Sequence, residues 1–64
     1  HSAVMFVSFL RGLMHQAVPD STILINSLKN ERSEGYKKRL TDAGIQYDIF
    51  ASQENEVYIF QGFN

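Results

Sequence analysis

The sequence predicts a small two-layer α/β domain of the α+β type, with the element order α-β-α-β-β and the helices on one face of a three-stranded mixed sheet. Three observations support this prediction: an apolar stretch with helical period at the start, a β-branched run at 22–26 followed by a charged helical segment ending at Gly44, and two alternating runs at 45–50 and 57–61. A strand, a helix and a second strand form a βαβ unit, so we expect the first two strands to be parallel and the third to be antiparallel to the second.

The bulk properties limit the choice of class. A chain of 64 residues has room for one domain, 1–64, in which His1 and Ser2 read as a possible tag remnant outside the fold. It has no cysteine, which excludes a disulfide framework and thiolate chemistry and favours a reducing compartment, the cytoplasm. The net charge of −1 gives no long-range attraction to nucleic acid or anionic lipid.

The first helix is expected from Ser2, a candidate N-cap, to about Ala17. Its polar residues fall in one narrow wedge, and its apolar residues spread over roughly 200° of arc. These apolar residues are Met5, Phe6, Val7, Phe9, Leu10, Leu13, Met14 and Ala17. A helix on one sheet needs about half of that arc, so the excess, Met5 and Phe9 above all, predicts a second apolar neighbour. The alternative for 4–9 is a buried strand.

A membrane span is excluded for this stretch. A span needs about 20 apolar residues, and here it would have to include Arg11, His15 and Gln16. The segment 18–21 instead predicts a turn, because Pro19 has no N–H to continue a helix and forces Val18 away from the helical region. The strand at 22–26 follows this turn.

The second helix is expected from about Glu31 to Ala43, with Asn30 or Ser33 as its cap. Its narrow apolar stripe, Tyr36, Leu40 and Ala43, suits a helix that lies on a sheet. Gly44 fits the left-handed position after the helix, and Ile45 would fold back as the hydrophobic contact of a Schellman motif.

The alternation at the C-terminal end predicts which side chains face the helices. The expected inner residues are Ile45, Tyr47, Ile49, Val57 and Ile59. Phe50, Tyr58 and Phe60 would then lie on the outer face, where two helices cannot cover them. Exposed aromatic residues of this kind bind proteins or stack on unpaired bases. The acidic neighbours Asp48, Glu54 and Glu56 repel phosphate, which favours a protein partner.

An alternative treats residues 21–29 as a helix. The chain would then be a winged helix-turn-helix, with 33–43 as recognition helix and 51–55 as the tip of the wing. Arg32, Lys37, Lys38 and Arg39 would provide its nucleic-acid contacts. The β-prone run at 22–25 and a wing tip without Lys or Arg disfavour this alternative.

No catalytic or metal-binding pattern is present in the sequence. His15 has no second ligand at metal spacing, and the four glycines make no phosphate-binding loop. We therefore expect a non-enzymatic interaction module, an adaptor, inhibitor or regulatory subunit, that needs no cofactor, metal or small-molecule substrate. Its partner would be another protein or a second copy in a homodimer, with nucleic acid the less favoured choice. The expected contact residues are Phe50, Tyr58, Phe60, Met5 and Phe9.

Overall fold

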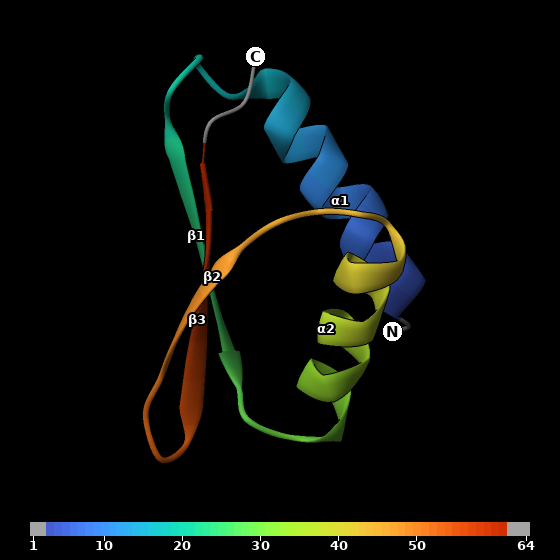
Figure 1. The fold of residues 1–64 in the computed structure, drawn as a ribbon, viewed down its shortest axis with the longest axis vertical. Coiled ribbons are helices and arrows are strands. Elements are labelled where there is room, and N and C mark those ends of the chain that lie inside the picture. Colours follow the sequence, from blue (N-terminus) through green and yellow to red (C-terminus); the bar gives the residue numbers. More distant parts are fainter. Residues whose placement is uncertain (1–2, 62–64) are drawn as a thin grey trace.

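The computed structural model describes residues 3–61 and confirms the order α-β-α-β-β. The elements are α1 (Ala3–Gln16), β1 (Thr22–Leu28), α2 (Glu31–Asp42), β2 (Asp48–Ala51) and β3 (Asn55–Gln61). Both helices lie on the same face of the three-stranded sheet (Figure 1). The predicted N-cap Ser2 falls outside the described residues.

The sheet has the order β1-β3-β2, and both pairings are antiparallel. The expectation of a mixed sheet with β1 beside β2 was therefore wrong. β1 and β2 run in the same direction, but β3 lies between them and pairs with β1 over its whole length. The physical reason is strand length, because seven-residue β3 can match seven-residue β1, whereas β2 has only four residues. The strand at β1 also rules out the winged-helix alternative.

α2 begins and ends where the sequence predicts. Asn30 is its N-cap: the Asn30 side chain accepts from the Ser33 N–H at 3.1 Å, and Ser33 Oγ accepts from the Asn30 N–H at 3.1 Å. At the other end Gly44 has φ of 71°, its N–H donates to the Thr41 carbonyl, and the Ile45 N–H donates to the Leu40 carbonyl. This bond pattern confirms the Schellman motif.

The turn before β1 is also confirmed. The Ser21 N–H donates to the Val18 carbonyl at 3.0 Å, which closes a four-residue turn with Pro19 at its second position. Asp20 follows with a φ of 67°, the left-handed conformation that a type II turn requires there. Aspartate tolerates this region better than most residues.

The core lies between the sheet and the helices, but the predicted inner residues of β3 were wrong. Tyr58 and Phe60 are fully buried together with Leu10 and Leu40. Ile25 pairs with Tyr58 and Ile23 with Phe60, so these side chains share the inner face. Val57 and Ile59, which were expected inside, lie on the outer face. Ile45 and Tyr47 pack against the core as predicted, and Phe50 lies on the outer face as predicted. Ile49 shares the register of Tyr58 but is 42% exposed, so its predicted burial was wrong.

Aromatic contacts join the two layers of this core. Phe6 of α1 stacks on Tyr36 of α2 with ring centres 4.2 Å apart, and it forms a T-shaped pair with Tyr58 of β3, with ring centres 6.2 Å apart. Tyr47 stacks on Tyr58 at 5.7 Å. Large rings provide much buried apolar area per residue, which a domain of this size needs.

Candidate functional site

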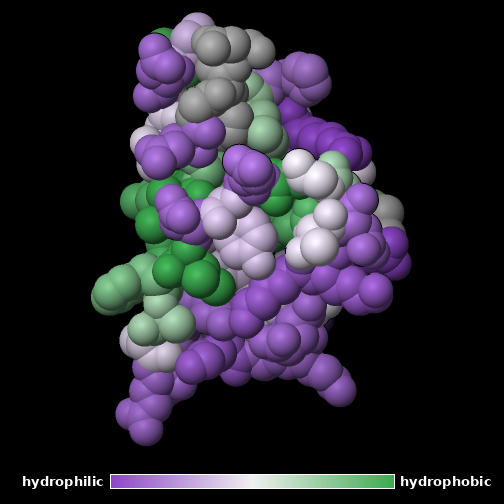
Figure 2. Space-filling model, viewed as in Figure 1, coloured by the Kyte–Doolittle hydropathy of each residue, from purple (hydrophilic) through white to green (hydrophobic). Residues whose placement is uncertain are grey.

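The outer face of the sheet, opposite the helices, carries an apolar patch that we call the outer patch. It consists of Leu24, Leu28, Phe50, Val57 and Ile59. Leu24 lies beside Ile59, and Phe50 beside Val57, across neighbouring strands. Leu24 is 65% exposed and Phe50 is 69% exposed. Figure 2 shows apolar residues gathered on the sheet side of the molecule, whereas hydrophilic residues cover α2.

The outer patch differs from the predicted contact surface. Phe50 lies there as expected, but Tyr58 and Phe60 are buried in the core and were wrongly assigned to it. Sequence reasoning missed Leu24 and Leu28 because the face of β1 was left unassigned. Side chains alternate between the two faces of the sheet along 22–28 and along 55–61. Matching these two alternations is the signal that could have found Leu24 and Leu28.

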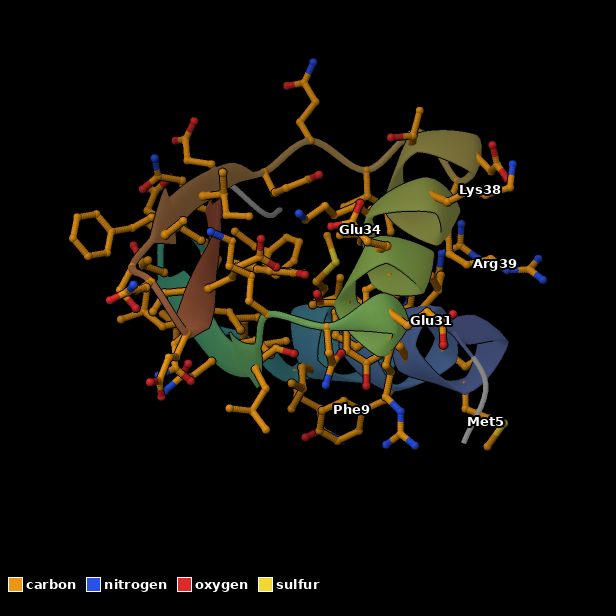
Figure 3. All side chains as sticks on the ribbon, turned by 90° about the horizontal axis from the view of Figure 1, so that it is seen from below. Met5, Phe9, Glu31, Glu34, Lys38 and Arg39 are labelled. Atoms are coloured by element: carbon orange, nitrogen blue, oxygen red, sulfur yellow. The ribbon has the colours of Figure 1, made fainter. Side chains whose placement is uncertain are left out.

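A second exposed apolar surface lies on α1. Met5 is 59% exposed and Phe9 is 62% exposed, as the wide apolar arc of the helix predicts. Figure 3 shows both side chains on the side of α1 that faces away from α2. Val7 and Leu10 occupy the opposite side and are buried.

An ion pair joins α2 to β3, with the Glu56 carboxylate buried and Lys37 partly exposed. Lys37 Nζ lies 2.7 Å from Glu56 Oε2 and 2.9 Å from Glu34 Oε2. The Tyr58 hydroxyl lies 3.1 Å from Glu56 Oε1 and 3.2 Å from the Ser33 carbonyl oxygen, which are both acceptors for its proton. Glu56 is only 2% exposed, so every strong contact of its carboxylate is made within the protein.

The ionisation of these groups follows from their contacts. The hydrogen bond from Lys37 lowers the pKa of Glu56, and the hydrogen bonds to Glu56 and Glu34 raise the pKa of Lys37. Burial raises the pKa of Tyr58 to about 12, and its hydrogen bond to Glu56 acts in the same direction. At neutral pH the group is therefore a charged pair with a neutral tyrosine. It joins α2 to β3, and sequence reasoning missed it because its partners are far apart in the chain.

The basic residues of the nucleic-acid alternative do not form one free surface. Lys37 is held by Glu56 and Glu34, and Lys38 lies 3.8 Å from Asp42. Arg32 and Arg39 are exposed on α2. In Figure 3, Glu31 lies on the same side of α2 as Arg39, away from the sheet, so charges of both signs share this face.

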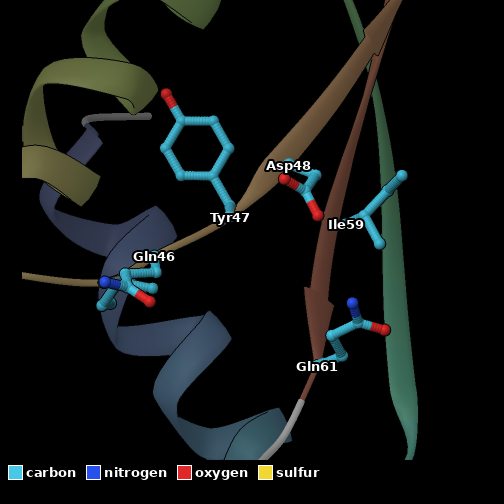
Figure 4. A pocket seen from close by; sticks show the side chains of 6 residues that line it. Gln46, Tyr47, Asp48, Ile59 and Gln61 are labelled. Atoms are coloured by element: carbon cyan, nitrogen blue, oxygen red, sulfur yellow. The ribbon is translucent and has the colours of Figure 1, made fainter.

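An open hollow of about 480 Å³ lies where the segment before β2 leaves β3 (Figure 4). Its lining residues are Ile45, Gln46, Tyr47, Asp48, Ile59 and Gln61. Asp48 is the one acidic residue among these six, and Tyr47 adds a phenol ring. These six lining residues include no His, Lys, Cys or Ser.

Within residues 3–61, no group of three His, Asp or Glu side chains could hold a metal ion. In the same part of the chain, neither helix has the length and apolar character needed to cross a membrane. Comparisons of the chain with protein-family models, with curated proteins and with solved structures found no match.

Proposed function

We propose that this chain is a non-enzymatic protein-interaction module that binds a protein partner through the outer patch. The single observation that carries the proposal is the exposure of Leu24, Leu28 and Phe50, each above 60%, on a sheet face that neither helix covers. Burial of one such side chain stabilises a complex by about 1.5–3 kcal/mol. Scattered apolar residues are normal on a surface, but a contiguous set across three strands is typical of an interface.

The surroundings of the outer patch support a protein rather than a nucleic acid as partner. The polar residues that share its face are Thr22, Asn26, Asp48, Asn55 and Gln61. None of them is basic, and Asp48 is acidic, so the face has no charge with which to bind phosphate. A complementary partner would present an apolar surface bordered by basic side chains.

The biological setting that fits this proposal is a reducing compartment such as the cytoplasm, because the chain has no cysteine. A small module of this kind acts as an adaptor, inhibitor or regulatory subunit.

Photo-crosslinking from within the patch tests the proposal. A photoreactive phenylalanine analogue at position 50 should crosslink to a specific protein in cells of the source organism, and excess unlabelled protein should suppress the product. Excess Phe50→Ser protein should suppress it much less. The matched control carries the analogue at position 38, on the exposed face of α2, and should give no such product.

Two results would overturn the proposal. One is equal crosslinking from positions 50 and 38. The other is tight binding of random oligonucleotides that weakens steeply with salt and is lost on substitution of Arg32, Lys38 and Arg39, because that behaviour belongs to phosphate recognition.

A further inference from the structure

A second hollow, of about 290 Å³, lies between the two helices, and we call it the arginine hollow. Its lining residues are Val7, Ser8 and Arg11 of α1 and Arg39, Asp42 and Ala43 of α2. The two arginines are 28 positions apart in the chain, so it is the packing of α1 beside α2 that brings them to one place. Figure 3 shows Arg39 directed away from the sheet, on the helix side of the molecule.

Small side chains next to the two arginines leave the space of the hollow. Ser8 lies three positions before Arg11, and Ala43 lies four positions after Arg39, so each helix sets a small residue beside its arginine. Val7 is buried at the base of the hollow, whereas Ser8 and both arginines are exposed. The guanidinium groups and the hydroxyl are therefore accessible to a ligand from solvent.

The guanidinium groups of Arg11 and Arg39 make no ion pair with a carboxylate among residues 3–61. The acid in the lining, Asp42, lies 3.8 Å from Lys38 Nζ instead. Two positive charges that line one hollow repel each other, and an anion bound between them converts this repulsion into two attractions. The arrangement is therefore that of an anion site.

We infer that the arginine hollow binds the phosphate group of a phosphorylated protein side chain. A guanidinium group donates two parallel hydrogen bonds to an oxyanion. A carboxylate has two oxygen atoms, which one guanidinium group occupies, whereas a phosphate monoester has three terminal oxygens that accept from several donors. Arg11, Arg39 and the Ser8 hydroxyl provide such a set of donors.

The charge around the hollow matches that of a phosphate monoester. Arg11, Arg39 and Lys38 are basic and Asp42 is acidic, which leaves two positive charges. A phosphate monoester carries about −1.5 to −2 charges at pH 7. The contact with Lys38 also reduces the repulsion between the Asp42 carboxylate and the phosphate.

The size of the hollow indicates that the phosphate belongs to a larger molecule. Sites that enclose a whole small molecule have volumes of roughly 300–1,000 Å³ and mostly apolar walls. The arginine hollow is smaller, and four of its six lining residues are polar or charged. None of the six is aromatic, so a nucleobase has no ring to stack on. A phosphorylated side chain suits this site, because its peptide stays on the surface outside, and arginine clusters commonly recognise such side chains.

Binding of a degenerate peptide library tests the inference. Wild-type protein should retain heptapeptides with a central phosphoserine, phosphothreonine or phosphotyrosine and should not retain the same library after phosphatase treatment. Arg11→Gln and Arg39→Gln should each weaken binding of the selected phosphopeptides by about tenfold or more, because each removes charged hydrogen bonds.

The matched control is Arg32→Gln, which is exposed on the same helix as Arg39 but does not line the hollow. It should leave phosphopeptide binding unchanged. All three variants should keep the wild-type melting temperature, because the substituted side chains are exposed.

Three results would overturn the inference. The first is that the phosphorylated library is not retained, or is retained no better than the unphosphorylated one. The second is an equal loss of binding for Arg32→Gln and Arg39→Gln, which indicates general attraction between charges. The third is displacement of a selected phosphopeptide by an equal concentration of inorganic phosphate, because that result assigns the hollow to free phosphate.

The arginine hollow lies in the helix layer, and the outer patch lies on the opposite face of the sheet, so the two proposals can fail independently. Phe50→Ser should leave phosphopeptide binding unchanged, and Arg39→Gln should leave crosslinking from position 50 in place. A product that is crosslinked from position 38 and disappears after phosphatase treatment belongs to the arginine hollow, because Lys38 lies beside Asp42.

Discussion

The two faces of β3 carry residues that simple hydropathy would assign the other way round. The inner face holds a carboxylate and two aromatic rings, Glu56, Tyr58 and Phe60, all nearly or fully buried. The outer face holds two β-branched aliphatic residues, Val57 and Ile59, which are only partly covered. The inner face is buried because its polar atoms have partners: the Tyr58 hydroxyl contacts the Ser33 carbonyl, and Lys37 neutralises Glu56. A polar residue can be core when the opposite layer satisfies it.

Among the substitutions that compare the inner and outer faces of the sheet, Phe60→Ala should lower the free energy of unfolding most. Removal of this fully buried ring leaves a cavity and should reduce the free energy of unfolding by about 3–5 kcal/mol. Urea denaturation followed by circular dichroism measures this change. A loss below about 1 kcal/mol would show that the inner face does not form the core.

Glu56→Gln should produce the next largest loss in the free energy of unfolding, about 2–3 kcal/mol, because it removes a charged hydrogen-bond partner from a buried site. Lys37 is 28% exposed and keeps its contact with Glu34, which limits the loss. A double-mutant cycle with Lys37→Met measures the coupling between the two side chains. Additive losses would show that the pair does not act as a unit.

The cluster of Glu56, Lys37 and Tyr58 predicts how the free energy of unfolding depends on pH. Because the pKa of Glu56 is lower in the folded chain, its contribution is fully present above about pH 4.5 and is lost as pH falls through the folded value. Because the pKa of Tyr58 is raised from 10.0 to about 12, stability also falls as pH rises through that range, and the raised pKa of Lys37 acts in the same direction. Thermal melting against pH should show both losses, and Glu56→Gln should flatten the acid one.

The smallest expected change in the free energy of unfolding comes from a Phe→Ala substitution on the outer face of the sheet. Phe50→Ala removes an exposed ring and should change the free energy of unfolding by about 0.5 kcal/mol or less. The urea experiment used for Phe60→Ala checks this directly, with the chemistry of the substitution held constant. A loss comparable to that of Phe60→Ala would mean that the outer patch is covered within the chain itself.

Local signals in the sequence were sufficient for the elements of this fold. Asn30 and Gly44 bound α2 because capping and the left-handed C′ conformation depend on residues within a few positions of each other. Pro19 likewise sets the turn before β1. The exposure of Met5 and Phe9 followed from the width of the apolar arc on α1, which is also a local property.

Only the tertiary structure decided which strands pair and which face of β3 is buried. The sequence by itself determined the order of the elements, the ends of α2 and an excess of apolar surface. It did not determine that β3 lies between β1 and β2, because strand partners depend on matching lengths far apart in the chain. It also did not determine which face of β3 is buried, because both faces are rich in apolar residues. Lys37, which lies 19 positions before Glu56, decides that question by neutralising its charge inside the core.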